Sequence, residues 1–271
     1  MMADTPAPDV EARLQLAVDI AREAGLSTLE LFRSDRLGLE HKGDGSPVTL
    51  ADKQAEELLR EQITGAFPDD AILGEEFGSS DGKTGFQWVL DPIDGTKSFI
   101  TGVPLYTTLV GVLREGEPVA GVIYSPGTDE IAWAGVGGGC WYRIGDAKAT
   151  RTMVSGTAEL AEATCLTSEV KSFTKYRGPV AREAYDQLEA ACRLTRTWGD
   201  GFGYLLVATG RADICFDPIV NLWDIAACMP VITEAGGVFT DWEGTPTVHS
   251  PHSVATNPQL APAVLEILRG G

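Results

Sequence analysis

The segment WVLDPIDGTKSF, Trp88 to Phe99, joins a run of strand-forming residues to a polar turn. Its apolar start predicts a buried strand that ends at Asp91, and Pro92 then favours a turn because it lacks a backbone donor. Asp91 and Asp94 place two carboxylates at this turn, three residues apart. Asp, Pro and Gly are common turn residues, so turn chemistry alone explains the motif as well as metal chemistry does.

The same segment offers ligands for a metal ion and for phosphate. Two carboxylates with the Ile93 carbonyl between them are hard oxygen ligands of the kind that Mg²⁺ or Mn²⁺ prefers. The backbone N–H groups of Gly95 and Thr96 follow directly and could bind a phosphate oxygen, more strongly if a helix begins there. The segment therefore predicts a combined metal and phosphate site.

Composition narrows the class of protein. The chain has 271 residues, 44% hydrophobic and 22% charged, which is typical of a soluble globular protein. A net charge of -18, from 21 basic and 39 acidic residues, argues against a nucleic-acid partner. No apolar run is long enough for a membrane span, and the N-terminus lacks the features of a secretory signal. We therefore expect a cytoplasmic protein that has no membrane partner.

The sequence pattern changes once along the chain. Amphipathic helices are predicted over Asp9–Phe32 and Thr49–Ile63, and antiparallel strands over 86–142. Strands then alternate with helices, which is typical of an α/β arrangement. We predict an antiparallel α+β lobe at 9–148 that carries most metal ligands. An α/β lobe at 149–271 follows, with a small-molecule site in the cleft between them.

Helices in the second part of the chain are predicted from apolar spacing and caps. They cover Pro179–Ala191, Gly203–Ala208 and Asp224–Ala235. Pro230 lies inside the last of these and predicts a kink, because it costs a backbone hydrogen bond.

Four further carboxylates lie at predicted element boundaries: Asp52, Glu75, Glu76 and Asp224. An aspartate near a helix start is ordinarily a cap, and a glutamate after a strand is ordinarily a solvated loop residue. Those explanations account for each residue separately. The recurrence of carboxylates at strand and helix ends favours a shared metal site.

Three motifs together resemble the inositol monophosphatase superfamily of metal-dependent phosphatases. They are GEE (Gly74–Glu76), WVLDPIDGT (Trp88–Thr96), and WDIAA with EAGG after it (Trp223–Gly237). The resemblance extends over nearly the whole chain. It implies a layered αβαβα sandwich of the kind shared with fructose-1,6-bisphosphatase, a homodimer, and two to three Mg²⁺ or Mn²⁺ ions per site.

The resemblance also implies a metal-ligand set. Glu75, Asp91 and the Ile93 carbonyl would hold one ion. Asp91, Asp94 and Asp224 would hold a second, so that Asp91 bridges the two, and a third ion would contact Glu75 mainly through water.

The resemblance assigns the remaining catalytic roles to neighbouring residues. Thr96, helped by Asp52, would position the attacking water, and the Gly95 and Thr96 amides would hold the phosphate. Glu76, which would lie behind the residues that bind the metal directly, would adjust the affinity for the metal. In two-metal phosphoryl transfer, one ion activates the water and the other stabilises the leaving alkoxide.

Some residues depart from the inositol phosphatase pattern. Lys97 stands where those enzymes usually have threonine, and it resembles histidinol-phosphate phosphatases and nucleotide phosphatases. Asp217 and Asn221 stand where inositol phosphatases carry glutamate and histidine. The segment 196–224 as a whole, with Pro230 after it, resembles the histidinol-phosphate phosphatase branch.

Charge complementarity favours the same substrate. Histidinol phosphate carries an ammonium and an imidazole, so its pocket needs carboxylates. We predict that Asp200 and Asp217 bind the cation and that Asn221 binds the ring, while Trp198 or Phe202 packs on it. Lys97 and Asp224 complete the predicted substrate-binding set.

The predicted function is Mg²⁺-dependent hydrolysis of the small phosphate ester L-histidinol phosphate. Three alternatives remain open. The first is an inositol-1-phosphate phosphatase, which shares every catalytic residue. The second is a broader sugar or nucleotide phosphatase of the same superfamily, and the third is a metal- or phosphate-binding protein without turnover.

Overall fold

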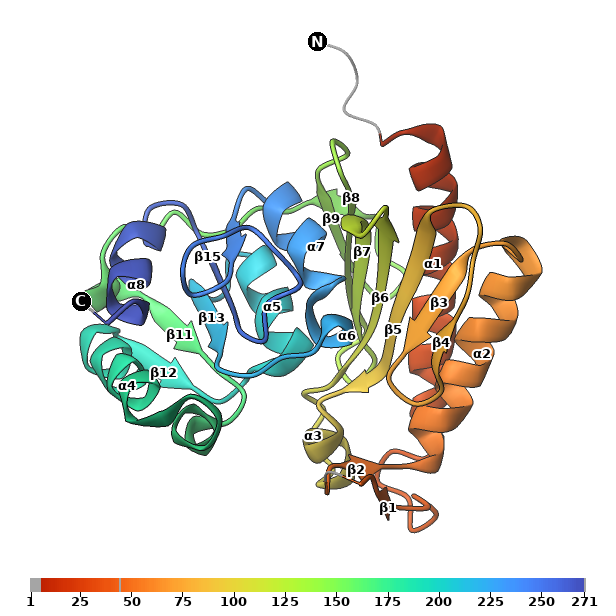
Figure 1. Ribbon diagram of the computed structural model, residues 1–271, viewed down its shortest axis with the longest axis horizontal. Helices are drawn as coiled ribbons and strands as arrows, with labels where there is room; N and C mark the ends of the chain where they lie inside the picture. The colour runs from red at the N-terminus through yellow and green to blue at the C-terminus, as the bar shows by residue number, and fades with distance from the viewer. Residues whose placement is uncertain (1–5, 44, 271) are drawn as a thin grey trace.

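Five layers of helices and sheets make up the computed structural model, which describes residues 6–43 and 45–270 (Figure 1). An outer helical layer packs on the first sheet, short helices lie between the two sheets, and a final helical layer covers the second sheet. The predicted αβαβα sandwich is therefore confirmed. The helices of the three layers are, in turn, α1 (Pro8–Thr28) and α2 (Leu50–Ala66); α5 (Asp200–Ala208), α6 (Leu222–Ile225) and α7 (Cys228–Glu234); α4 (Val170–Ala191) and α8 (Ala261–Leu268).

The first sheet has eight strands in the order β10-β9-β8-β7-β6-β5-β3-β4. All neighbours are antiparallel except β3 and β5, as the predicted hairpins require. The strands are β3 (Ala71–Gly74), β4 (Gly78–Ser80), β5 (Phe86–Asp94), β6 (Thr107–Arg114), β7 (Glu117–Ser125), β8 (Glu130–Gly135), β9 (Cys140–Ile144) and β10 (Thr150–Arg151). The sheet therefore extends to Arg151, just beyond residue 148, where the first lobe was predicted to end.

The second sheet has five strands in the order β12-β11-β13-β15-β14. Parallel pairing joins β12, β11 and β13, and antiparallel pairing joins the others. The strands are β11 (Thr164–Leu166), β12 (Leu194–Arg196), β13 (Ile214–Asp217), β14 (Val238–Thr240) and β15 (Ser253–Thr256). Smaller elements are the pair β1 (Glu40–His41) and β2 (Pro47–Val48), the short helix α3 (Thr96–Ile100), and a 3₁₀ turn at Leu160–Glu162.

Glycines on the first sheet let the middle helices approach it closely. Gly111 of β6 lies opposite Gly121 of β7 in the strand register. A Cβ on Gly121 would lie 2.1 Å from the Ala227 carbonyl oxygen, and one on Gly111 would lie 2.9 Å from the Ala226 Cβ. Side chains at these two positions would push the junction of α6 and α7 off the sheet. The glycines therefore help to set how near α6 lies to β5.

The predicted helix Asp224–Ala235 is wrong as a single helix, because α6 and α7 are separate. The break falls at Ala226 and Ala227. Pro230 has no N–H to donate to the Ala226 carbonyl four residues earlier, and its ring clashes with that carbonyl. Ala226 and Ala227 keep helical backbone angles, so the chain stays helical in conformation while its hydrogen-bond pattern is interrupted, which agrees with the disturbance predicted from Pro230.

Helices α4 and α5 also differ from the prediction. Helix α4 begins at Val170 instead of Pro179, with a break at Gly178 (φ 80°, ψ -172°) that makes two helical segments of it. Glycine tolerates a positive φ, so the turn before Pro179 carries little strain. Helix α5 begins at Asp200, three residues before the prediction.

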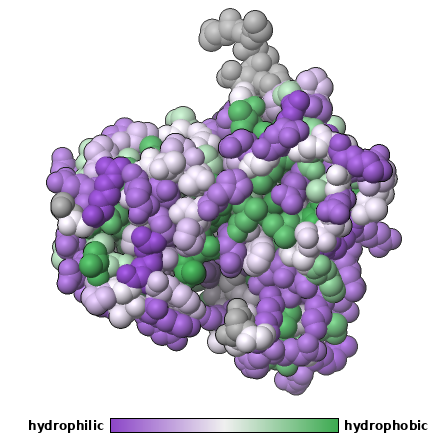
Figure 2. Space-filling view, viewed as in Figure 1, coloured by the Kyte–Doolittle hydropathy of each residue, from purple (hydrophilic) through white to green (hydrophobic). Residues whose placement is uncertain are grey.

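Hydrophilic residues cover most of the face shown in Figure 2, and hydrophobic ones gather towards its middle, where the two sheets approach each other. Within the described part of the chain, no helix combines the length and the apolar composition that a membrane crossing requires.

Candidate active site

Strand β5 supplies Asp91 and Asp94, and it continues through both. The prediction that the strand ends at Asp91 is wrong. Its pairing with β6 shifts register between Asp91 and Asp94, which is a β-bulge at the position of Pro92. In a regular strand, residues three apart face opposite sides of the sheet. Because the bulge adds a residue to this strand, both carboxylates turn to the same side.

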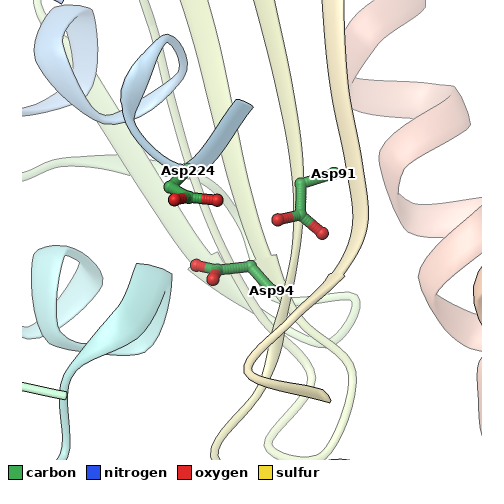
Figure 3. Close-up of side chains that lie close together, drawn as sticks. All are labelled: Asp91, Asp94 and Asp224. Atoms are coloured by element: carbon green, nitrogen blue, oxygen red, sulfur yellow. The ribbon is translucent and has the colours of Figure 1, made fainter. Parts of the chain in front are cut away.

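Helix α6 supplies the third carboxylate, Asp224. Asn221 caps this helix: the Asn221 amide N–H donates to Asp224 Oδ2 at 2.7 Å, and the two residues form a reciprocal capping box. The cap holds Asp224 towards β5. One oxygen from each of Asp91, Asp94 and Asp224 lies within 4.8 Å of the others, and the three side chains point towards one another (Figure 3).

These three carboxylates lack positive neighbours. Burial raises the pKa of Asp91, and the charges of Glu75, Asp94 and Asp224 raise it further. Burial is also the main reason that the pKa of Asp224 rises to about 7. A backbone N–H of Gly201 donates to Asp94 Oδ2, but no ion pair among the described residues involves any of the three aspartates. Clustered acidic oxygens of this kind fit a hard divalent cation such as Mg²⁺.

Glu75 and Glu76 follow β3 and share a lysine. Lys42 Nζ lies 2.7 Å from Glu75 Oε1 and 2.8 Å from Glu76 Oε1. The Glu75 amide donates to the Leu90 carbonyl at 3.2 Å, so Glu75 runs beside β5 next to Asp91. Its charge has the largest electrostatic effect on the pKa of Asp91. Glu75 therefore lies next to the aspartate cluster. Its carboxylate is not one of the three whose oxygens lie within 4.8 Å of one another.

Asp52 lies in the first turn of α2, where it forms a capping box with Thr49. The Thr49 amide and hydroxyl donate to Asp52 Oδ2 at 2.7 and 2.5 Å. Among the described residues, no group hydrogen-bonds to the other oxygen, Oδ1, although it is buried. Burial raises the pKa of Asp52 to about 6. Thr96 donates its hydroxyl to the Ile93 carbonyl at 3.1 Å, so the Asp52–Thr96 pairing stays a prediction.

Two adjoining cavities lie beside the aspartate cluster. The smaller, of about 80 Å³, is lined by Asp94 and Asp224 together with Asp217. The larger, of about 330 Å³, is called the chamber below. It is lined by Ser46, Pro47, Glu75, Gly95, Thr96, Lys97, Ser98, Ser168, Glu169, Ser172, Tyr176, Thr197, Asp200 and Ile219.

Asp200 connects the two cavities, since it lines both. Its φ of 55° lies in the left-handed region, which is uncommon for a residue with a side chain, although aspartate tolerates it better than most. Burial is the main cause that raises its pKa to about 7. A Cβ on Gly95 would lie 3.3 Å from Asp200 Oδ2, so this carboxylate lies beside the predicted phosphate-binding turn.

Asp217, Asn221 and Lys97 are engaged with other protein groups. Asp217 is buried and accepts the Ser168 amide and hydroxyl at 2.8 and 2.6 Å, which fixes Ser168 on the cavity wall. The exposed Asn221 caps α6, as described above. Lys97 lies in the chamber with its Nζ 3.4 Å from Glu169 Oε2.

The sequence analysis missed part of the chamber wall. Ser172 and Tyr176 come from the first segment of α4, which was not predicted as a helix, and Glu169 directly precedes that segment. Their spacing of three and four residues places them on one side of a helix, and this was the available signal. Trp198 and Phe202, predicted to pack on a substrate ring, do not line either cavity.

The chain is similar to known proteins both in sequence and in structure. The sequence profile of the inositol monophosphatase family matches residues 9–270. A histidinol-phosphatase from Chlorobaculum parvum is 40% identical over 235 residues, which cover 87% of this chain and 88% of that protein. An inositol-1-monophosphatase from Caulobacter vibrioides is 33% identical over 265 residues, covering 96% and 99%. The crystal structure of the extragenic suppressor protein SuhB from Bartonella henselae superposes with a TM-score of 0.88 at 26% identity, covering 96% and 99%.

Proposed function

The chain belongs to the inositol monophosphatase family and is a phosphatase, and from that premise we propose that it hydrolyses L-histidinol phosphate to L-histidinol and phosphate in a Mg²⁺-dependent reaction. The observation that carries the choice of substrate is Asp200. Its half-buried carboxylate, on a residue with a left-handed backbone, lies where the cavity beside the proposed metal ligands opens into the chamber. A cationic group next to the phosphate would offset the cost of burying that charge.

Asp91, Asp94 and Asp224 would hold Mg²⁺, together with Glu75 and the Ile93 carbonyl. When bound, Mg²⁺ supplies Lewis acidity for the attack of water on phosphorus and for departure of the alcohol. Its binding would also neutralise the mutual repulsion that raises the pKa of Asp91.

Backbone and side-chain groups at the start of α3 would hold the phosphate and the water. The Gly95 and Thr96 amides, which lie between the end of β5 and the first residue of α3, would donate to phosphate oxygens. The Thr96 hydroxyl would bind the attacking water and pass the proton that the water loses to the Asp52 carboxylate. The unpartnered Oδ1 of Asp52 and its raised pKa suit a proton acceptor near neutral pH.

Asp200 would bind the ammonium of the amino alcohol, and the other two predicted residues would assist it. Asp217 would add negative charge behind the site and hold Ser168 towards the substrate. Asn221 would act through the cap that orients Asp224. Both therefore act as positioning residues in this proposal.

The test is phosphate release with Mg²⁺ from three substrates at equal concentration: histidinol phosphate, inositol 1-phosphate and adenosine 3′,5′-bisphosphate. We expect kcat/KM for histidinol phosphate to exceed the others by about a hundredfold, equivalent to roughly 3 kcal/mol. Asp200→Asn should remove most of that preference. A wild-type enzyme that preferred inositol 1-phosphate would contradict the proposed substrate and leave the metal site standing.

Inositol-1-phosphate phosphatase is the second candidate. The hydroxyls of Ser168, Ser172 and Thr197 line the chamber and could bind a polyol. The 33% identity with the Caulobacter vibrioides protein also supports it. The same three-substrate comparison decides between the two.

A further inference from the structure

Lys97 and Glu169 form an ion pair across the chamber. Lys97 lies in α3 and Glu169 directly precedes α4, 72 residues later in the chain. Lys97 Nζ is 3.4 Å from Glu169 Oε2, and the lysine side chain is 70% exposed, against 30% for the glutamate. A long contact to an exposed lysine is weak and easily exchanged.

Other groups hold the Glu169 carboxylate in place. The Ser172 hydroxyl donates to Oε2 at 2.8 Å, and Lys171 Nζ lies 2.9 Å from Oε1. Burial alone would raise the pKa of Glu169, but the bonds from Lys171 and Ser172 and the charge of Lys97 outweigh burial and bring the pKa to about 2. Glu169 therefore keeps a fixed negative charge even if Lys97 moves away.

The helix segment that carries Glu169 is anchored. Phe173 is fully buried, and its ring contacts those of Tyr185, Phe216 and Trp242. This anchor presents Glu169 and Tyr176 along one side of the segment to the chamber. The break at Gly178 ends the segment, so that the rest of α4 turns away from the site.

We propose that Glu169 is a specificity-determining residue that binds the outer N–H-bearing group of the substrate alcohol, and that this group displaces Lys97 from Glu169. The inference rests on the proposed function, since it requires a phosphate ester with a nitrogenous alcohol. Asp200, next to the phosphate turn, takes the inner ammonium. Glu169, which lines only the chamber, takes the outer ring, and Tyr176 lines the same chamber.

Replacement of Lys97 by the substrate at Glu169 would favour phosphate esters whose alcohol carries N–H donors. Lys97 directly follows Thr96, so the freed ammonium is placed to approach the phosphate. A substrate that is anionic at one end and carries N–H donors at the other satisfies both residues of the ion pair. The phosphate of a neutral polyol would draw Lys97 away and leave Glu169 with only Ser172 and the exposed Lys171 as donors. Glu169 therefore favours the first substrate and disfavours the second.

The experiment compares Glu169→Gln, Glu169→Asp and the control Glu183→Gln with wild type. Glu183 lies on the exposed side of the second segment of α4, outside the chamber. KM and kcat are measured with histidinol phosphate and with inositol 1-phosphate, and circular dichroism checks folding. In Glu169→Gln we expect KM for histidinol phosphate to rise about tenfold with kcat changed less than about threefold. KM for inositol 1-phosphate should stay the same or fall, Glu169→Asp should recover part of the loss, and the control should match wild type.

Two results overturn the inference and can be told apart. If wild type prefers histidinol phosphate and Glu169→Gln keeps that preference, or loses both activities equally, Glu169 is structural and the proposed function stands. If wild type prefers inositol 1-phosphate, the proposed function fails and the inference fails with it. Should Glu169→Gln not fold, Glu169→Asp decides: an unchanged KM for both substrates contradicts the role assigned here.

Discussion

Asp70 and Asp91 are both buried aspartates of the first half of the chain, and they lie in opposite electrostatic environments. Asp70 accepts Arg13 Nε at 2.7 Å, Arg13 Nη2 at 2.8 Å and Trp88 Nε1 at 2.9 Å. Asp91 accepts the Ile93 amide at 3.1 Å, and its charged neighbours are carboxylates. Both are almost fully buried, so the number of donors, and not burial, distinguishes them.

The pKa values move in opposite directions for that reason. Burial alone would raise the pKa of Asp70, but hydrogen bonds from Arg13, Thr84 and Trp88 outweigh it and lower the pKa. Burial raises the pKa of Asp91, and neighbouring carboxylates add to the effect. A compensated buried charge stabilises the fold, whereas an uncompensated one costs stability and marks a functional site.

The largest expected effect is the loss of activity in Asp91→Asn. We expect kcat to fall by at least about a thousandfold, roughly 4 kcal/mol, because the proposed bridging metal ligand is lost. The metal-free protein should melt no lower than wild type, since one of the repelling charges is gone. Phosphate release and thermal melting in EDTA measure the two effects. A variant that kept its rate but lost stability would show that Asp91 is merely structural.

Asp70→Asn should lose stability and keep its activity, the reverse of Asp91→Asn. An amide cannot compensate Arg13, so the variant leaves a buried charge unpaired and should lose about 3 kcal/mol of unfolding free energy. Its kcat/KM should stay within about twofold of wild type while it is folded. Urea unfolding gives the first value and phosphate release the second.

Asp69→Asn is the matched control for this comparison. Asp69 is the exposed neighbour of Asp70 and pairs only loosely with Lys83, at 3.3 Å. Its substitution should change the unfolding free energy by less than about 0.5 kcal/mol. Equal losses in the two variants would mean that the Arg13–Asp70 contact does not matter for stability.

Mg²⁺ should stabilise only proteins whose aspartate cluster is intact. At a hundred times its dissociation constant, a ligand that binds only the native state adds about 2.7 kcal/mol. We expect this gain in wild type and in Asp70→Asn, and none in Asp91→Asn. Melting curves with Mg²⁺ and with EDTA measure it, and NaCl at the same ionic strength controls for screening. An equal gain in all three proteins would place the cation elsewhere.

The sequence predicted the elements of the site better than their mutual arrangement. The strand before Asp91 and the Thr49 cap of α2 follow from local patterns, and both are present. The bulge that turns Asp91 and Asp94 to one side depends on pairing with β6, which no local pattern encodes. The interruption between α6 and α7, by contrast, follows from Pro230, which the sequence itself shows.

Partners distant in the chain explain what the sequence analysis missed. Arg13 and Asp70 are 57 residues apart, and Lys97 and Glu169 are 72 apart. Nothing in either local sequence shows which charges are compensated. The sequence therefore indicated where carboxylates gather, and the structure was needed to separate those that stabilise the fold from those open to a ligand.

The smallest expected effect is the pH dependence of the Asp70 contribution, and it has a defined sign. The pKa of Asp70 is lowered in the folded protein, so just below the unfolded-state pKa of about 3.9 the unfolded chain binds more protons than the native one. The stability that Asp70 contributes is therefore complete above about pH 5 and is lost as the pH falls towards the folded-state pKa. Urea unfolding at several pH values between about 6 and 3.5 should show a constant gap between wild type and Asp70→Asn that narrows by on the order of 1 kcal/mol at the acid end. A gap that widened on acidification would mean that Asp70 is destabilised by burial, as Asp91 is, in spite of Arg13.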